Sequence, residues 1–226
     1  MINHHYQDED DRRPVVIFGN LSMASLAKFV LEHDSPYRVE AFTVDANYRE
    51  SEEYEGLPLV PFEELEKFYK PNEVRILIPM GYHKINSVRR ERFESALARG
   101  YDFVTYISSH ACIWPGAQIG RNVLIYEHVI LQPFASVGDN AIVRSGANIP
   151  HHCSVGAHAF ISGGVVTSGK VDVGEQAFLG VGAVITNNIA PRCFVGAGAV
   201  VVDPTEELGV YVGNPARILR KFMNAA

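Results

Sequence analysis

Two adjacent histidines, His151 and His152, stand in the segment "IPHHCS" at positions 149–154, within a region that otherwise repeats small and aliphatic residues. An imidazole titrates near neutral pH, so it can take a proton from an attacking hydroxyl or amine and later return it. Neighbours on an extended chain point in different directions, so the two rings are expected to have different surroundings. Which ring could act as a base depends on the elements that carry them.

The region that carries the histidines, after residue 108, repeats every six residues. Aliphatic residues recur at this interval from Ile113 to Ile185, with Thr167 as the exception, and small or aliphatic residues recur four positions later, from Ala117 to Ile189. Six residues form a short strand and a tight turn, and three such pieces close a triangular coil that buries the aliphatic position. The repeat predicts a parallel β-helix with about eighteen residues per coil.

The first half of the chain follows a different pattern. Short β-branched runs such as "PVVIF", "RVEAFTVD", "VRILIPM" and "DFVTYI" alternate with the amphipathic stretches "SMASLAKFVLEHD", "PFEELEKFYK" and "KINSVRRERFESALARG". Alternating strands and helices are typical of a parallel sheet flanked by helices. We therefore expect a flexible tail at residues 1–13, a small Rossmann-like domain at 14–107 and a β-helix domain at 108–226.

Composition and charge narrow the class of protein. The formal net charge of -6 argues against nucleic acid as the main partner. The cysteines Cys112, Cys153 and Cys193 lie far apart without a CxxC pair, so neither a disulfide framework nor a thiolate zinc site is indicated. The polar start lacks the apolar core of a signal peptide, and no segment is apolar for long enough to span a bilayer. These features favour a cytoplasmic protein.

From Pro14 to Lys221 the chain resembles the hexapeptide-repeat acyltransferase superfamily, whose left-handed β-helices associate as homotrimers. The closing segment "VYVGNPARILRKFM" looks like that superfamily's final turn and short C-terminal helix. With a Rossmann-like domain in front, the chain is similar to the bacterial sialic acid O-acetyltransferases and the N-acetyltransferases of nucleotide-linked amino sugars. The resemblance implies acetyl-CoA as co-substrate and acylation of an amino or hydroxyl group on a nucleotide-linked or surface-glycan sugar, such as one of lipopolysaccharide.

The hexad register separates the two histidines. In the hexad that begins at Ile149, the buried slots belong to Ile149 and Cys153, so neither imidazole fills the core. The resemblance places His151 on the family's catalytic position, as the general base. It also places Gly169, one coil above, where the family uses a backbone amide to hold the oxyanion of the tetrahedral intermediate.

The chain departs from the family at His152, where a carboxylate is common. A protonated His152 would disfavour protonation of His151, so Glu127, Asp139 or another group would have to orient the base. His152 itself is expected either to contact the substrate or to form a structural hydrogen bond. His128 is expected to be a solvated or interface residue.

Substrate and cofactor contacts are also implied by the resemblance. The turn "FGNLSM" precedes a helix, so its backbone amides could meet a phosphate or ribose. The expected substrate-binding residues are Asn20, Leu21, Ser22, Asp45, Arg144 and His152, with "GYHK" at 81–84 lining the next turn. The expected CoA-binding residues are Phe160, where the family often has a histidine, together with Gly180, Val181, Ala197 and Arg217.

Two other classes stay open. Some β-helix trimers are zinc-dependent lyases, and here the histidines would be His151, His152 and His158, although adjacent residues make poor partners on one metal and no metal site is expected. A non-catalytic trimeric sugar-binding scaffold is the other alternative. The sequence leaves open O- versus N-acylation, the sugar, the nucleotide and the length of the acyl chain.

Overall fold

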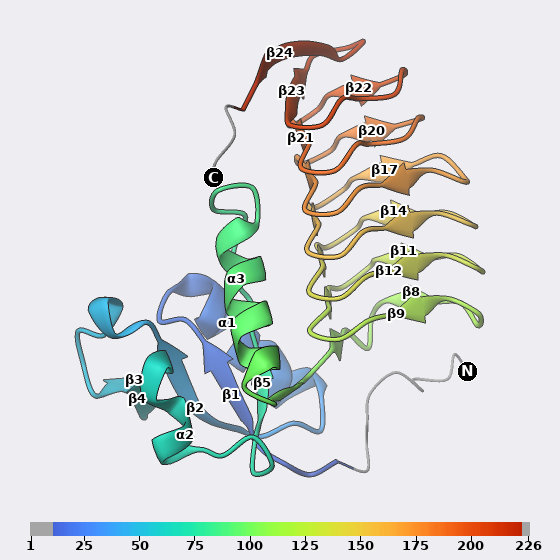
Figure 1. Ribbon diagram of the computed structural model, residues 1–226. Coiled ribbons are helices and arrows are strands. Elements are labelled where there is room, and N and C mark those ends of the chain that lie inside the picture. The colour runs from blue at the N-terminus through green and yellow to red at the C-terminus, as the bar shows by residue number, and fades with distance from the viewer. Residues whose placement is uncertain (1–10, 223–226) are drawn as a thin grey trace.

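The structure is a computed structural model that describes residues 11–222. A sheet with helices is followed along the chain by a tall stack of short strands (Figure 1). The first sheet has the order β3-β4-β2-β1-β5-β6, with β3 antiparallel to β4 and the other pairs parallel. Its strands are β1 (Val15–Phe18), β2 (Val39–Val44), β3 (Glu53–Tyr54), β4 (Leu57–Pro61), β5 (Arg75–Leu77) and β6 (Asp102–Phe103).

Helices accompany this sheet, as the alternating pattern predicts. They are α1 (Ser22–Asp34), α2 (Leu65–Phe68) and α3 (Ser87–Ala98), with 3-10 turns at η1 (Ala46–Tyr48) and η2 (Phe62–Glu64). All residues of β1 are buried, which fits a parallel strand covered on both faces. On α1 the buried residues are Ala24, Ala27 and Leu31, the spacing of a single helix face. The predicted α/β sheet with flanking helices is confirmed.

Both ends of this first part differ in detail from the expectation. Residues 1–10 of the predicted tail lie outside the described residues, but Asp11 and Arg13 are held by ion pairs. Arg13 pairs with Asp102 at 2.8 Å, and Asp11 lies 3.5 Å from the Arg75 guanidinium. The strand expected at residues 102–107 is split, and its second piece, β7 (Tyr106–Ile107), pairs with β10 of the following part.

That following part is a parallel β-helix with three faces (Figure 1). The first face has the strand order β24-β23-β21-β19-β16-β13-β10-β7, the second β22-β20-β17-β14-β11-β8 and the third β18-β15-β12-β9. Strands pair one coil apart, as Leu124 does with Ile142 and Ile142 with Phe160. The strands are β8 (Cys112–Ile113), β9 (Gln118–Ile119), β10 (Leu124–Ile125), β11 (Ile130–Leu131), β12 (Ser136–Val137), β13 (Ile142–Val143), β14 (Asn148–Ile149), β15 (Ser154–Val155), β16 (Phe160–Ile161), β17 (Val166–Thr167), β18 (Asp172–Val173), β19 (Phe178–Leu179), β20 (Val184–Ile185), β21 (Phe194–Val195), β22 (Val200–Val201), β23 (Gly209–Val212) and β24 (Arg217–Lys221).

The interior of the β-helix is the set of residues that the six-residue repeat predicts. One apolar cluster runs from Ile107 to Ala216 and contains both registers, with Ile119 at its margin. Thr167, the exception in the aliphatic register, is also buried. Because burial follows the repeat, Ile149 and Cys153 lie inside and the histidines between them lie outside.

The predicted short C-terminal helix is wrong, since the described chain ends in a hairpin. Strand β23 continues the first face beside β21, and β24 turns back antiparallel to β23, with Val210 opposite Arg220. Pairing with β24 gives the backbone groups at the edge of the last coil hydrogen-bond partners, which a helix would leave open. Arg217 therefore lies on an edge strand rather than on a helix.

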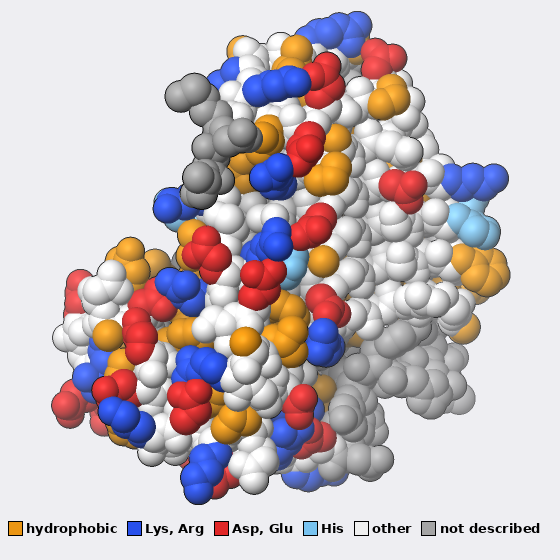
Figure 2. All heavy atoms as spheres, viewed as in Figure 1, with side chains coloured by type: hydrophobic (Ala, Val, Ile, Leu, Met, Phe, Trp, Pro, Cys, Tyr) orange, Lys and Arg blue, Asp and Glu red, His pale blue; other side chains and the backbone are white. Residues whose placement is uncertain are grey.

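The first part of the chain covers the first face of the β-helix. The outward residues Leu124, Ile142, Phe160 and Phe178 belong to one apolar cluster with Val15 and other residues of the first sheet and its helices. Figure 2 shows charged side chains of both signs over the first part, whereas much of the β-helix surface in this view is neither charged nor hydrophobic. Among residues 11–222, no helix combines the length and the apolar character that crossing a membrane would need.

Candidate active site

Three columns of turns join the faces of the β-helix, and we call them the histidine corner, the glycine corner and the covered corner. The histidine corner joins the second face to the third at residues 132–134, 150–152 and 168–170. The glycine corner joins the first face to the second at 144–146, 162–164 and 180–182, and the covered corner joins the third face to the first at 120–122, 138–140 and 156–158. The last residue of most turns has a left-handed backbone, with φ of 59° at His152 and 61° at His158.

His151 is exposed at the histidine corner. Its backbone N–H donates to Oε1 of Gln132 at 3.1 Å, which ties the turn to the coil below. Its ring Nδ1 lies 3.2 Å from Nδ1 of His152. Its Nε2 has no hydrogen-bond partner among the described residues, so this nitrogen is open to a ligand.

Gly169 lies directly against the His151 ring, which confirms the predicted stacking of the two positions. A Cβ on Gly169 would be 2.9 Å from both Cε1 and Nε2 of His151. The backbone of Gly169 is outside the left-handed region, so the glycine is needed for the space that the ring occupies. Its N–H donates to no acceptor within residues 11–222. An imidazole nitrogen and a backbone N–H, both without hydrogen-bond partners among the described residues, therefore lie at the same corner.

His152 is exposed beside Phe134, with ring centroids 4.9 Å apart. Cys153 turns inward instead, and its Sγ donates to the carbonyl of Ser168 at 3.0 Å. The carboxylates expected to orient His151 are engaged elsewhere in this chain. Glu127 accepts from Oγ of Ser145 at 2.8 Å at the glycine corner, and Asp139 pairs with Arg121 at 2.7 Å at the covered corner.

The expected nucleotide contacts gather at the carboxyl ends of β1 and β2. Asn20 donates its amide to the carbonyl of Tyr48 at 3.0 Å, and Leu21 is 75% exposed next to Ser22, the first residue of α1. Asp45 follows β2 and forms a two-pronged ion pair with Arg92 of α3, with distances of 2.8 and 2.7 Å.

This edge has the geometry of a ligand site in α/β proteins. β1 has β2 on one side and β5 on the other, so the order of the strands reverses beside β1. In parallel sheets, ligands bind outside the carboxyl ends of the strands at such a reversal. Asp45 is nevertheless tied to Arg92, so it supports the site as half of an ion pair rather than as a free carboxylate. We call this edge, with residues 19–22, 45–48 and 80–84, the crevice.

Arg144 does not lie near His151 in this chain. It is half-buried at the glycine corner, and its guanidinium lies 4.1 Å from the ring centroid of Tyr126. One of its nitrogens, Nη1, and the Tyr126 hydroxyl are buried without a hydrogen-bond partner among the described residues. Desolvation raises the pKa of Tyr126, so its hydroxyl stays protonated at neutral pH.

Some of the residues expected to bind CoA are covered or closely stacked, and others are exposed. Phe160 is 7% exposed and lies beneath Tyr82, with ring centroids 5.5 Å apart, so its surface faces the first part of the chain. A Cβ on Gly180 would be 2.5 Å from the nitrogen of Ala197, which means that close stacking of coils explains this glycine. Val181, Ala197 and Arg217 are exposed.

The other histidines lie elsewhere. His128 is exposed at the glycine corner, as expected. His158 is buried at the covered corner, where Nδ1 lies 2.7 Å from the amide of Asn140. Burial, together with the positive charges of Arg89 and Arg90, lowers the pKa of His158 to about 4. Within the described residues, no group of three or more His, Cys, Asp or Glu side chains could hold a metal ion.

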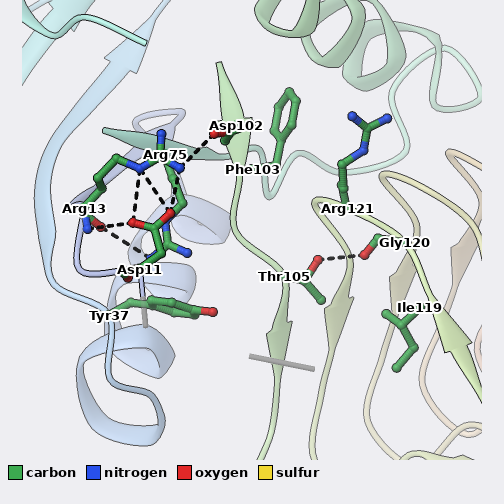
Figure 3. A pocket seen from close by; sticks show the side chains of 10 residues that line it. All are labelled: Asp11, Arg13, Tyr37, Arg75, Asp102, Phe103, Thr105, Ile119, Gly120 and Arg121. Atoms are coloured by element: carbon green, nitrogen blue, oxygen red, sulfur yellow. Dashed lines mark hydrogen bonds and ion pairs between the residues drawn. The ribbon is translucent and has the colours of Figure 1, made fainter. Parts of the chain in front are cut away.

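A pocket of ≈ 400 Å³ lies at the opposite edge of the first sheet (Figure 3). Its walls include Asp11, Arg13, Arg75 and Asp102, which precede or begin β1, β5 and β6. These charges pair with one another across the pocket, and the pairing lowers the pKa of Asp11 to about 2. The pocket is at the amino ends of the strands, so we assign its charges to anchoring the start of the chain.

Sequence reasoning missed Gln132 and Phe134 in the histidine corner, and Arg89 and Asn86 behind the crevice. Gln132 lies eighteen residues before Pro150, so the coil period could have indicated it as a neighbour of His151. The buried partners Asn122, Asn140, His158 and Gln176 stand at the same turn position of successive coils. A polar residue repeated at that spacing was the available signal for a covered corner.

Comparison with known proteins adds independent information. Residues 116–151 match the family described as bacterial transferase hexapeptide (six repeats), and no curated protein matches the chain. The acetyltransferase domain of PglB from Neisseria gonorrhoeae FA1090 is 26% identical, with a TM-score of 0.82 over 92% of this chain and 100% of that one. A variant of perosamine N-acetyltransferase from Caulobacter crescentus, in complex with CoA and GDP-perosamine, is 27% identical, with a TM-score of 0.82 over 92% and 97%. WeeI from Acinetobacter baumannii AYE shares the fold at 22% identity, with a TM-score of 0.72 over 91% of this chain and 99% of that one.

Proposed function

Because the chain belongs to the hexapeptide-repeat acetyltransferase family, we propose that it transfers an acetyl group from acetyl-CoA to an amino group of a nucleotide-linked sugar. The PglB domain has been solved with acetyl coenzyme A, and the Caulobacter N-acetyltransferase with CoA and GDP-perosamine. These relatives favour nitrogen over oxygen as the acceptor and acetyl over a longer acyl group.

The observation that carries the proposal is the contact between His151 and Gly169. Nε2 of His151 takes a proton from the sugar amine as the amine nitrogen attacks the thioester carbonyl carbon. The oxygen of the resulting tetrahedral intermediate accepts a hydrogen bond from the free N–H of Gly169, an interaction that contributes about 3 to 4 kcal/mol in other enzymes. The carbon–sulfur bond then breaks, and the imidazolium returns the proton to the CoA thiolate.

His152 takes the place of the missing carboxylate in this account. When His151 carries its proton on Nδ1, it donates that proton toward Nδ1 of His152, and the lone pair on Nε2 is left for the substrate. The Phe134 ring lies beside His152, tilted by 40° to the imidazole. A neutral imidazole orients the base but stabilises the imidazolium less than a carboxylate does.

Within one chain, the crevice, the CoA candidates and His151 lie on different sides of the β-helix. The crevice lies over the first face, the exposed CoA candidates Val181 and Ala197 are at or near the glycine corner, and His151 is on the far side of the second face. The second face also exposes Val166 and Val184, at 40% and 38%. A homotrimer that buries the second faces around its axis would set the histidine corner of one chain beside the glycine corner of the next.

In such a trimer the crevice holds the nucleotide through Asn20, Leu21, Ser22 and the supporting residue Asp45. Arg144 meets a substrate phosphate or carboxylate at the glycine corner. The acetyl-CoA lies between neighbouring β-helices, against the backbone near Gly180, Val181 and Ala197, with Arg217 near its phosphates. Phe160 takes no part in the cofactor site, because Tyr82 covers it.

The test uses acetyl-CoA and a panel of nucleotide-linked sugars, each supplied as the amino sugar and as the matching hydroxy sugar. We expect free thiol to appear only with amino sugars, and the product to gain one acetyl group by mass spectrometry. Thiol release with hydroxy sugars alone would reassign the acceptor to oxygen. Absence of thiol release with every sugar would contradict the proposed activity.

The assembly has its own test. Light scattering should give the mass of three chains, and exposure of Val166 makes Val166→Glu the variant expected to yield monomers. A folded Val166→Glu monomer should bind nucleotide and lose acetyl transfer. A monomer with wild-type turnover would contradict a site shared between chains.

A further inference from the structure

One buried arginine of α3 joins the crevice to the β-helix. Arg89 is fully buried, and among the described residues it has no carboxylate partner. Burial lowers its pKa to about 9, so the guanidinium still carries its charge at neutral pH. Its hydrogen bonds run to the carbonyls of Asn140 at 3.1 Å, His158 at 2.6 Å, Ala159 at 3.2 Å, Met80 at 3.0 Å and Gly81 at 3.2 Å, and to Oδ1 of Asn86 at 3.0 Å.

These acceptors belong to two separate structures. Asn140 and His158 are in the covered corner of the β-helix, whereas Met80 and Gly81 are in the loop that leads from β5 to α3. The planar guanidinium offers its donors in a fixed fork, so it sets the distance and the angle between its acceptors. A single side chain therefore fixes the β5–α3 loop against the β-helix.

The loop has a backbone that needs such support. Lys84, Ile85 and Asn86 all have positive φ, at 48°, 51° and 64°. A left-handed backbone costs about 1 to 2 kcal/mol per residue and is rare for a β-branched side chain such as that of Ile85. Consecutive residues in this region persist only where the surroundings determine them.

Asn86 supplies the second tie to the β-helix. Its amide donates to the carbonyls of Gln176 at 2.9 Å and Ala177 at 3.3 Å. Tyr82 rests on Phe178, with ring centroids 4.2 Å apart. The polar contacts of Arg89 and Asn86 and the ring contact of Tyr82 thus hold the loop against the β-helix.

The loop at residues 80–86 forms one side of the crevice and carries basic side chains there. It follows the carboxyl end of β5, next to β1, where the strand order reverses. His83 and Lys84 are exposed, and their side chains have no hydrogen bond or ion pair with described residues. Two basic side chains on a fixed loop suit the diphosphate of a nucleotide-linked sugar.

We propose that Arg89 is a positioning residue for the nucleotide-linked substrate: it locks residues 80–86 to the β-helix so that the loop receives the diphosphate in a preformed shape. This inference rests on the proposed function for its ligand. The locking of the loop is a separate, measurable property of the protein without ligand.

The test compares Arg89→Lys and Arg89→Met with Arg90→Met in the full-length protein. Arg90 is the matched control, because its side chain also reaches the β-helix, through Gln176 and Glu175, but forms no hydrogen bond or ion pair with residues 80–86. Amide hydrogen exchange of residues 80–86 reports the locking. Calorimetry with a nucleoside diphosphate and with CoA reports the two binding sites.

We expect both Arg89 variants to speed exchange in residues 80–86 by about tenfold or more and to weaken nucleoside diphosphate binding by about tenfold. CoA binding should stay within about twofold, since the CoA candidates lie away from the loop. Arg90→Met should change none of the three. If the Arg89 variants do not fold, Asn86→Gly, which keeps the left-handed backbone but removes the amide, should show the same pattern with smaller changes.

Wild-type exchange in residues 80–86 of a folded Arg89 variant would overturn the inference, as would an equal loss of CoA and nucleotide affinity. If the wild-type protein binds CoA but no nucleoside diphosphate, the proposed substrate is wrong and the role of Arg89 in binding it fails too. In that case the exchange measurement still reports whether Arg89 locks the loop, which separates the two failures.

Discussion

Two histidines at the same register position of the β-helix, His152 and His158, have opposite surroundings. Both end a corner turn with a left-handed backbone, at φ of 59° and 61°. His152 is exposed beside His151 and Phe134, whereas His158 is 7% exposed beneath α3. The repeat fixes the same backbone at both corners, so the difference comes from what covers each one.

The two corners also differ in how their polar groups are paired. At the covered corner, Asn122 donates to Oδ1 of Asn140 at 2.7 Å, and the Asn140 amide lies 2.7 Å from Nδ1 of His158. At the histidine corner, Nε2 of His151 and the N–H of Gly169 are free among described residues. Buried polar groups require partners, while groups left open at a surface remain available for chemistry.

At the histidine corner, Gly169→Ala is expected to have a large effect on turnover. The added Cβ would be 2.9 Å from the His151 ring, so the ring must move, and a displacement of about 1 Å can cost about 100-fold in rate. Turnover should fall by about that factor, while the unfolding midpoint stays near the wild-type value. Ser168→Ala, one residue earlier on the same turn, is the control. Equal turnover of Gly169→Ala and Ser168→Ala would show that Gly169 is not needed for the reaction.

At the covered corner the matching change, Asn140→Gly, should reduce stability instead. Glycine keeps the left-handed backbone and removes only the amide, which leaves Asn122 and His158 with unpaired buried groups. The free energy of unfolding in urea should drop by about 2 to 3 kcal/mol. Lys170→Gly, at the equivalent turn position of the histidine corner, should leave it unchanged within about 0.5 kcal/mol. A similar loss in both variants would remove the distinction between the corners.

The free energy of unfolding should depend on pH through the titration of His158. Its pKa in the folded protein is lowered to about 4 by burial and by Arg89 and Arg90, against the opposing carboxylates Glu94 and Asp139. Because the unfolded chain binds the proton more readily, stability falls as pH falls below the ordinary histidine value of about 6.5. Between pH 7 and pH 5 this group should cost about 2 kcal/mol.

Urea unfolding of His158→Gln at the two pH values measures that contribution. The variant should lose about 2 kcal/mol less than the wild type on going to pH 5. His128→Gln, at an exposed corner, should behave like the wild type. An unchanged pH dependence in His158→Gln would show that the buried imidazole does not titrate as described.

The smallest effect is expected from His152→Ala. The variant loses the orienting contact of 3.2 Å to His151 but keeps the base and the Gly169 donor. A hydrogen bond of this kind contributes about 0.5 to 1.5 kcal/mol, so kcat should fall by about three- to tenfold. A loss as large as that of Gly169→Ala would make His152 a direct participant.

The interior and the stacking of the β-helix could be predicted because both follow from the period. Residues one coil apart must lie next to each other, and so Gly169 was placed against His151 correctly. Burial of Ile149 and Cys153 likewise separated the histidines from the core. These predictions needed no individual contact energies, because the backbone pairing between coils repeats the same contacts along the chain.

The docking of the first part was not predictable in the same way. Phe160 was expected to contact CoA, but Tyr82 in the loop after β5 lies over it, and no period relates these two segments. The resemblance implied a C-terminal helix, yet the segment pairs with β23, because the last coil offers an open edge. Arg89 was missed because a charged residue on an amphipathic helix is usually solvated.

In the proposed mechanism the exposed histidine corner performs the chemistry and the covered corner does not. Thiol release from acetyl-CoA, with the nucleotide-linked amino sugar that the panel identifies, measures it directly in His151→Ala and in His158→Gln at pH 7.5. We predict that His151→Ala loses at least about 100-fold in kcat with CoA affinity unchanged, and that His158→Gln stays within about threefold of the wild type. Wild-type turnover in a folded His151→Ala protein would contradict the account.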